Sequence, residues 1–174
     1  GGGGFLQSDL DLCIADLKAA GKLPSNITSP TINVAAGTNN WTGGGYDLEN
    51  TLDIYCVGTL VPQATINIYI GDGTFGSFAN MVQSAVNDNC DIITISYGVD
   101  EYLLGAFGVS GDFMATALSN AATKGIAVFV CSGDYGSAGN QGYSRTGGNP
   151  VESVSYPGSS PKVICVGGTH LVLD

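Results

Sequence analysis

The sequence predicts an α/β domain, with a mainly parallel β-sheet and helices on both of its faces. Segments with helical spacing alternate with strand-like segments along the 174 residues, which is the order expected for a parallel sheet. The strand-like segments are continuous apolar runs, as in strands that are covered on both faces. A chain of this length also fits one domain with a sizeable hydrophobic core.

The predicted elements begin with a helix over residues 8–20. Apolar side chains recur there at helical spacing, with Ser8 or Asp9 as the cap and Gly21 as the stop. Acidic residues in the first turn of segment 46–57 suit the dipole of a second helix. The other elements, in chain order, are strands at 31–35 and 65–70, a helix at 75–87, a strand at 91–97, a helix at 111–124 that Gly125 ends, and strands at 126–131 and 163–166.

The charge balance excludes several classes of partner. Five Lys and Arg residues against fifteen Asp and Glu residues give a formal charge of -10. A surface this poor in cations does not neutralise a phosphate backbone or an anionic membrane, so we expect neither nucleic acid nor membrane as a partner. No run of apolar residues is long enough to span a bilayer.

The cysteines and the single histidine do not predict a metal site. Five cysteines follow no C-x-x-C spacing, and zinc sites need such clusters. We expect Cys131, at the end of an apolar run, to be buried. Asn26 and Asn40 begin N-x-T triplets in turn-rich stretches and are candidate N-glycan acceptors. Together with the scarcity of lysine, this fits a secreted protein, or one in an acidic compartment.

Glu49 and Asp53 are the first candidates for chemistry. They lie four residues apart, and therefore on one face of the predicted helix. Two readings are open: a pair of solvated helix acids, or a buried pair in which one carboxyl takes up a proton. The apolar neighbours of the pair favour burial. These neighbours are Leu48, Leu52, Ile54 and Tyr55.

A second candidate follows the most apolar strand, because ligands of parallel sheets bind beyond the carboxyl ends of the strands. Asp134, in S-G-D-Y-G, is either an acid that points into that crevice or the cap of an Asx-turn. The stretch 71–76 is a weak match to a phosphate loop, because it lacks the G-K-[ST] ending. His170 has no serine-bearing turn around it and is a poor candidate for a base.

Four stretches in this order resemble the sedolisins, which are serine-carboxyl peptidases with a subtilisin-like fold. They are E-x-x-x-D at 49–53 with the strand after it, within residues 48–70, ITISYG at 93–98, AATKGIAVFVCSGDYGS at 121–137, and SYPGSSPKVICVGGT at 155–169. Tyr156 and Gly158 stand where the family usually has Phe and Ala, and Tyr135 stands where many members have Ser. The resemblance covers most of the chain from Asp47 onward.

The resemblance implies a role for each matching residue. Glu49 acts as the general base and later as the general acid, Asp53 orients it, and Asp134 is the oxyanion-hole acid. A protonated carboxyl donates a hydrogen bond to an oxyanion, which a carboxylate repels, so the activity is expected in acid. The residues implied to line the cleft for a peptide substrate are Ser96, Tyr97, Gly98, Ser132 and Gly133.

The departures from the family pattern are equally informative. The nucleophilic serine belongs to a G-T-S motif that this sequence lacks, and the family's calcium ligands are expected outside this chain. The family's first strand is also missing. Residues 1–174 are therefore interpreted as a partial catalytic domain that is inactive alone. A second chain or a missing segment would supply the serine.

Three other classes of protein are alternatives. A Ser-His-Asp subtilase needs an H-G-T motif where Glu49 stands, and that motif does not occur. A dinucleotide-binding domain needs G-x-G-x-x-G after a strand; residues 71–76 have this spacing, but no cationic residue lies near them in the sequence. The remaining alternative is a catalytically inactive protease-like domain that binds a partner or has a structural role. It explains the missing serine, but the presence of Glu49, Asp53 and Asp134 argues against it. Endopeptidase and tripeptidyl peptidase action both stay open.

Overall fold

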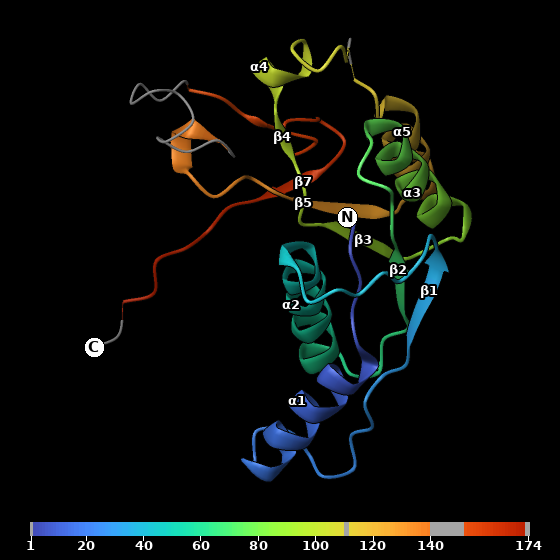
Figure 1. Cartoon of the computed structure of the whole chain (residues 1–174), viewed down its shortest axis with the longest axis vertical. Helices are drawn as coiled ribbons and strands as arrows, with labels where there is room; N and C mark the ends of the chain where they lie inside the picture. Colours follow the sequence, from blue (N-terminus) through green and yellow to red (C-terminus); the bar gives the residue numbers. More distant parts are fainter. Residues whose placement is uncertain (1, 110–111, 140–151, 173–174) are drawn as a thin grey trace. The chain divides into compact units, whose positions relative to one another are not determined.

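The computed structural model describes residues 2–109, 112–139 and 152–172 (Figure 1). Two compact units make up the chain, residues 1–81 and residues 82–174. Most predicted elements are present, with bounds that differ by a few residues. Among the described residues, no helix has both the length and the hydrophobicity needed to cross a membrane.

The first unit contains a two-stranded parallel sheet and two helices. Its elements are α1 (Gln7–Ala19), β1 (Ile32–Ala36), α2 (Gly45–Leu60) and β2 (Ile66–Tyr69). β1 and β2 pair in parallel, with Ile32 opposite Ile66. A parallel pair needs a crossover, and α2 provides it. Helix α1 begins after Leu6 without a side-chain cap, so neither Ser8 nor Asp9 caps it as the sequence suggested.

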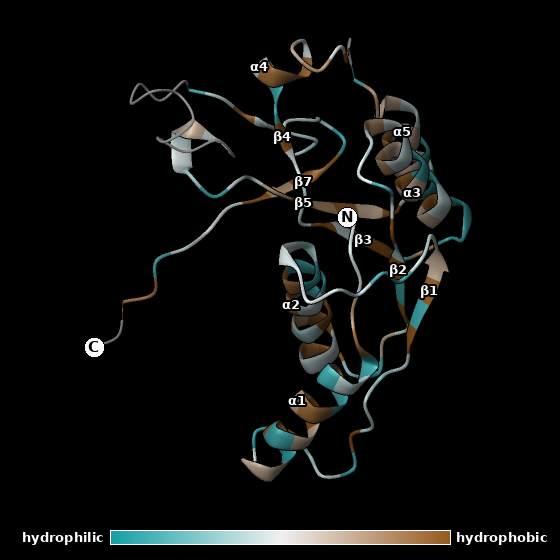
Figure 2. Cartoon of the chain, viewed as in Figure 1, coloured by the Kyte–Doolittle hydropathy of each residue, from teal (hydrophilic) through white to brown (hydrophobic). Residues whose placement is uncertain are grey.

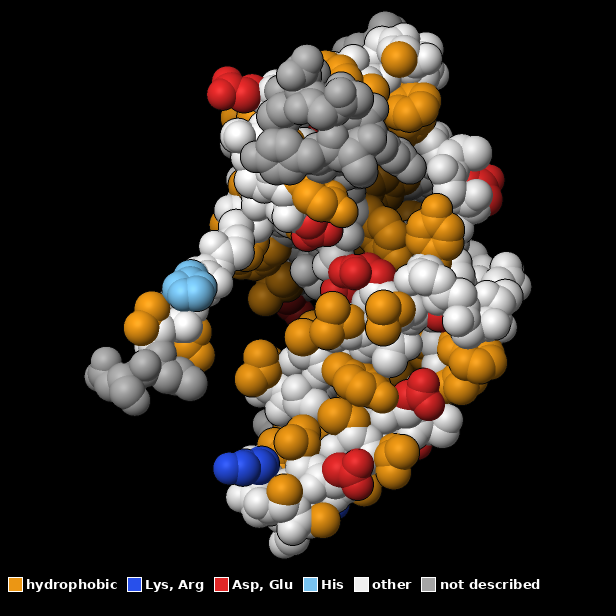
Figure 3. Space-filling view, turned by 60° about the vertical axis from the view of Figure 1, so that its left-hand side comes forward, with side chains coloured by type: hydrophobic (Ala, Val, Ile, Leu, Met, Phe, Trp, Pro, Cys, Tyr) orange, Lys and Arg blue, Asp and Glu red, His pale blue; other side chains and the backbone are white. Residues whose placement is uncertain are grey.

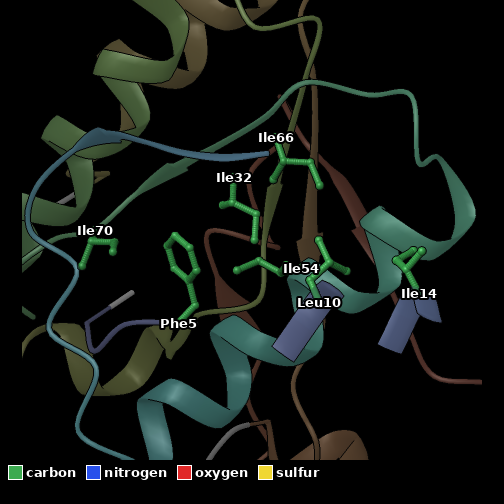
Figure 4. Packing of buried hydrophobic residues seen from close by; sticks show 7 residues of the cluster. All are labelled: Phe5, Leu10, Ile14, Ile32, Ile54, Ile66 and Ile70. Atoms are coloured by element: carbon green, nitrogen blue, oxygen red, sulfur yellow. The ribbon is translucent and has the colours of Figure 1, made fainter. Parts of the chain in front are cut away.

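The core of the first unit is aliphatic apart from Phe5 and lies between α1, α2 and the strands (Figure 4). Leu10 of α1 is fully buried, and Ile54 of α2 is 3% exposed. Gly58 permits this packing, because a Cβ there would lie 2.8 Å from Cδ1 of Leu10. The cluster comprises Phe5, Leu10, Ile14, Ile32, Ile54, Ile66 and Ile70.

The second unit is built on a parallel sheet in the order β3-β5-β7. Its strands are β3 (Ile92–Ile95), β5 (Ala127–Cys131) and β7 (Ile164–Val166). Figure 2 shows β3 and β5 as mainly hydrophobic. Helix α5 (Ala115–Lys124) packs on β5. It ends at Gly125 with φ at 73°, a left-handed conformation in which glycine carries no Cβ penalty.

Helix α3 (Phe75–Asn87) is found over the predicted residues. The predicted start of the helix at 111–124 lies partly outside the described residues, and the described helix begins at Ala115. Residues 96–97 and 126 are not part of the strands predicted to contain them.

Four short elements have no counterpart in the predictions. They are β4 (Val99–Asp100), α4 (Glu101–Leu104), the 3-10 helix η1 (Gly136–Ala138) and β6 (Ser155–Tyr156). β4 and β6 pair antiparallel. A strand of two residues has no hydrophobic period, so only its partner defines it.

Full coverage of the sheet is not observed in the described residues of the second unit. Burial alternates along β3, where Ile93 and Ile95 are buried while Ile92 is 63% exposed. Cys131 is half-buried rather than buried. The second face of β3, with Ile92 and Thr94, is therefore open to solvent, whereas buried residues alternate with half-buried ones along β5.

Candidate active site

Helix α2 carries the first pair of candidate residues. Glu49 and Asp53 are one helical turn apart, and both are half-buried. Asp53 lies one turn from the buried Asn50, whereas Glu49 lies farther from the buried face of α2, which is formed by Asp47, Asn50, Ile54 and Gly58. The pair is thus neither fully solvated nor enclosed.

The apolar surroundings expected for this pair are only partly present. Ile54 is buried, but Leu48 is 73% exposed and Leu52 is 52% exposed. The expectation that these leucines shield the helix from water is wrong for the described chain. They lie on the side of α2 that points away from the core of its unit.

An exposed apolar row continues from these leucines along α2. It is formed by Leu48, Leu52, Cys56 and Leu60, at successive intervals of four residues. Leu60 is 81% exposed. Hydrophobic side chains are also visible at the surface of the lower part of Figure 3, where α1 and α2 lie. A row of this kind on a helix normally marks a contact surface.

Asp47, which the sequence suggested as a helix-start acid, is a buried hydrogen-bonding centre. Its side chain is 3% exposed. Oδ1 accepts the backbone N–H of Gly4 at 2.5 Å. Oδ2 accepts the backbone N–H groups of Thr42 at 2.7 Å and Gly44 at 3.0 Å, and the Thr42 hydroxyl at 3.1 Å. Asp47 thereby joins the first turn of α2 to two separate stretches of chain.

These hydrogen bonds lower the pKa of Asp47 to about 2. The largest cause is the Thr42 N–H, because a donated hydrogen bond favours the charged form of a carboxyl. Burial acts in the opposite direction, and the N–H groups of Gly4 and Gly44 add to the lowering. Asp47 consequently stays ionised in acid that protonates an ordinary aspartate.

Asn50 is a second buried polar residue of α2, and sequence reasoning missed it. It is 8% exposed, and its Nδ2 donates to the carbonyl oxygens of Gly2 at 2.8 Å and Gly4 at 3.3 Å. The available signal was its spacing. Asp47 and Asn50 share the periodicity of the apolar Ile54, which places polar groups on the core-facing side of the helix.

The second unit carries the other candidate residues at the carboxyl ends of two adjacent strands. Ser96, Tyr97 and Gly98 follow β3, and Ser132 and Gly133 follow β5. Since β3 and β5 pair in parallel with Ile95 opposite Val130, both segments leave the same edge of the sheet. Ser96 to Gly98 and Ser132 to Gly133 are all half-buried.

Asp134 lies in the turn that follows β5. Gly133 has φ at 100°, a conformation that glycine adopts readily, and the chain bends there. The backbone N–H of Ser132 donates to the Val166 carbonyl at 3.0 Å, which extends the β5–β7 contact up to the turn. Asp134 itself is exposed to solvent.

Each of the weaker sequence candidates either has a structural role or is exposed to solvent. Asp72, in the 71–76 stretch, accepts the Thr74 N–H at 2.9 Å and the Thr74 hydroxyl at 2.8 Å, which forms the turn before α3. His170 is exposed. In the described part of the chain, no three His, Cys, Asp or Glu side chains form a group that could hold a metal ion.

Comparisons with known proteins agree with the motifs. The model of the subtilase family matches residues 32–171. Kumamolisin from Bacillus sp. (strain MN-32) is 32% identical over 179 residues, which cover 98% of this chain and 30% of kumamolisin. Sedolisin from Pseudomonas sp. (strain 101) is 30% identical over 161 residues, which cover 84% of this chain and 26% of sedolisin. The chain thus spans about a third or less of these relatives.

A solved structure extends the similarity to the fold. Pseudomonas sedolisin, a serine-carboxyl proteinase complexed with two molecules of pseudo-iodotyrostatin, superposes with a TM-score of 0.68 at 25% identity. The match covers 99% of this chain and 48% of that structure. The subtilisin-like α/β fold predicted from the sequence is confirmed. The chain belongs to the subtilase family and is a sedolisin-like domain of it.

Proposed function

We propose that this chain is part of an acid-acting serine-carboxyl peptidase that hydrolyses peptide bonds with a Ser-Glu-Asp triad. Glu49 takes the proton of the serine as general base and returns it to the leaving amine. Asp53 orients Glu49, and Asp134 donates a hydrogen bond to the oxyanion. The observation that carries the proposal is the pair Glu49 and Asp53, half-buried on one flank of α2 in a sedolisin-like domain.

The proposed reaction requires acid for a chemical reason. A neutral Asp134 carboxyl donates to the negative oxygen of the tetrahedral intermediate, whereas its carboxylate would repel that oxygen. A carboxylate base such as Glu49 also stays functional at a pH at which imidazole is already protonated. The exposed position of Asp134, beyond the end of β5, leaves room for a peptide carbonyl beside it.

The substrate is proposed to be a peptide or protein chain. The backbone of Ser96 to Gly98, which directly follows β3, is suited to pair with an extended peptide as an added strand. Ser132 and Gly133 line the same edge. Endopeptidase and tripeptidyl peptidase action are both compatible with this arrangement.

The nucleophilic serine is proposed to come from a second chain or from a further segment of the same protein. The exposed apolar row of α2 supports this, because Leu48, Leu52, Cys56 and Leu60 run along the same flank as Glu49 and Asp53. A segment that covers the row would bring its own residues next to the proposed base. Calcium, if the protein binds it, is proposed to be held by residues outside this chain.

The central test is Glu49→Gln in the complete enzyme. Loss of the base is expected to lower kcat by about 10⁴-fold or more, as in other triads, while the circular dichroism spectrum stays unchanged. Glu152→Gln is the matched control, because Glu152 is an exposed acid of the second unit. A Glu49→Gln enzyme with full activity would show that Glu49 is not the base.

The intact mass of the native protein tests the origin of the serine. Denatured material, measured with and without reductant, should contain a second polypeptide or a chain heavier than 17.7 kDa. A single 17.7 kDa species without peptidase activity would favour the alternative function, a binding or structural domain that has lost catalysis. That result would remove the triad from this protein.

Secretion, or residence in an acidic compartment, is proposed with N-glycans at Asn26 and Asn40, both of which are exposed. Treatment of the native protein with an N-glycosidase and peptide mass mapping would identify the modified residues. Unmodified Asn26 and Asn40 in the native material would contradict the glycan assignment.

A further inference from the structure

We propose that Asp47 and Asn50 are positioning residues of the reaction. They fasten the first turns of α2 to the backbone of residues 2–5, and this contact sets the orientation of Glu49. The proposal rests on the proposed function, because it takes Glu49 as the base. Asp47 and Asn50 flank Glu49 in the sequence and are the only buried polar residues among the described residues of α2.

The two side chains bind backbone groups of Gly2 and Gly4 in one segment. Asp47 accepts the N–H of Gly4, and Asn50 donates to the carbonyl oxygens of Gly2 and Gly4. Residues three apart on a helix lie on the same face, so both contacts constrain α2 from one side. A rotation or a shift of α2 by one residue would break all of these hydrogen bonds.

The segment that they recognise is itself fixed. The N–H of Phe5 donates to Asn39 Oδ1 at 2.9 Å, and Asn39 Nδ2 donates back to the Phe5 carbonyl at 3.0 Å. The Phe5 side chain is 5% exposed and belongs to the core of the first unit. Residues 2–5 are therefore held in place and form a fixed support for α2.

Within this support, Gly3 and Gly4 have no space for a side chain. A Cβ at Gly3 would lie 2.6 Å from Asp47 Oδ1, and a Cβ at Gly4 would overlap Asn39 Oδ1 and the backbone nitrogen of Trp41. Glycines at these positions allow the backbone to approach α2 closely enough for the 2.5 Å bond from Gly4 to Asp47.

Such a support matters because Glu49 is on the flank of α2 and not in its packed core. A base must lie within hydrogen-bond reach of the proton it takes, and a displacement of about 1 Å costs on the order of a hundredfold in rate. The side chains of Asp47 and Asn50 make no chemical step. They determine where the helical turn that carries Glu49 lies.

Kinetics of the complete enzyme test the proposal. Asp47→Asn keeps an acceptor oxygen and Asp47→Ala removes both, so we expect kcat per folded molecule to fall about tenfold and about a hundredfold, respectively, with little change in KM. Asn50→Ala leaves every hydrogen bond of Asp47 in place and should lower kcat about tenfold. Asp16→Asn, on the exposed side of α1, is the control with unchanged kcat.

Active-site titration and the Glu49→Gln enzyme separate the possible results. If Asp47→Asn and Asn50→Ala both keep the wild-type kcat per folded molecule, while Glu49→Gln is inactive, the positioning role is wrong and the proposed function stands. If Glu49→Gln is fully active, the proposed function itself fails. If Asp47→Ala does not fold, Asn50→Ala still decides, because it changes one side of the contact only.

Discussion

The carboxylate of Asp47 accepts the backbone N–H of Gly4 at 2.5 Å, although 43 positions separate the two residues in the sequence. This bond connects the start of the described chain to the helix that carries Glu49 and Asp53. Its acceptor is charged and its donor is a backbone amide, a combination that gives short and strong hydrogen bonds. The proposed role of Glu49 as the base thereby gives Asp47 a part in both stability and catalysis.

The pH dependence of folding should report Asp47. Its pKa in the folded chain is about 2, below the ordinary value of 3.8. The stabilisation is therefore complete above the ordinary pKa and is lost as the pH falls through about 2. The urea concentration at the midpoint of unfolding, measured across this pH range, should be higher for wild type than for Asp47→Asn, and this difference should disappear near pH 2. For Asp16→Asn, the difference from wild type should show no such change. A gap that stays constant with pH would refute the assignment.

The support formed by residues 2–5 should not tolerate a methyl group at Gly4. A Cβ there would overlap Asn39 Oδ1 and the Trp41 backbone, whereas a Cβ at Gly2 meets no atom within 4 Å. Gly4→Ala is expected to lower the free energy of unfolding by about 1–3 kcal/mol, as overpacking does elsewhere, and Gly2→Ala by much less. Denaturant unfolding of both variants makes the comparison. Equal stability of Gly4→Ala and Gly2→Ala would mean that the backbone at Gly4 does not lie close to Asn39 and Trp41.

Replacement of Asp134 should change the pH at which the complete enzyme works. Asp134→Asn keeps a hydrogen-bond donor that does not ionise, so the activity should extend towards neutral pH. Asp134→Ala removes the donor and should cost about 10²–10³ in kcat. The profile of kcat against pH is the measurement, with Asp91→Asn as an exposed control. An unchanged acidic optimum in Asp134→Asn would exclude the oxyanion role.

Tyr156, where the family usually has Phe, should stabilise the second unit through its hydroxyl. The hydroxyl donates to Asp112 Oδ1 and accepts the N–H of the fully buried Met114 at 3.1 Å. Tyr156→Phe would leave that N–H without its partner, at a cost of about 1–3 kcal/mol in the free energy of unfolding. Denaturant unfolding tests this, with the exposed Tyr102→Phe as the control.

The stabilisation by Tyr156 should be lost at alkaline pH. Burial, followed by the hydrogen bond to Asp112, raises the pKa of Tyr156 above its ordinary value of 10.0. The contribution of Tyr156 to the free energy of unfolding is therefore present below pH 10.0 and is lost as the pH rises towards the folded-state pKa. The stability gap between wild type and Tyr156→Phe should shrink above pH 10.0, and a gap that widens would contradict this.

Local pattern was sufficient for most of the secondary structure. The helix at Phe75–Asn87 was predicted to the residue, because its apolar side chains repeat over several turns and a local signal of that length leaves little choice. The two-residue strands β4 and β6 could not be predicted, since each exists only through its pairing with the other.

The burial of the residues around the candidate site could not be predicted from local pattern. From sequence, Leu48 and Leu52 were expected to shield Glu49 and Asp53, yet both leucines are exposed. A hydrophobic residue on a helix reports that a face is apolar, but only the packing of other elements decides whether that face is covered.

The α/β class, the order of the main elements and the motifs that hold Glu49, Asp53 and Asp134 could be derived from spacing along the chain. The tertiary structure alone decided that Asp47 is a buried charge and that Asn50 binds the backbone of Gly2 and Gly4. The reason is the separation of the bonded residues along the sequence. Gly2 and Gly4, whose backbone groups the two side chains bind, lie more than forty residues away, where no local pattern records them. The other partners of Asp47, Thr42 and Gly44, are close in the sequence.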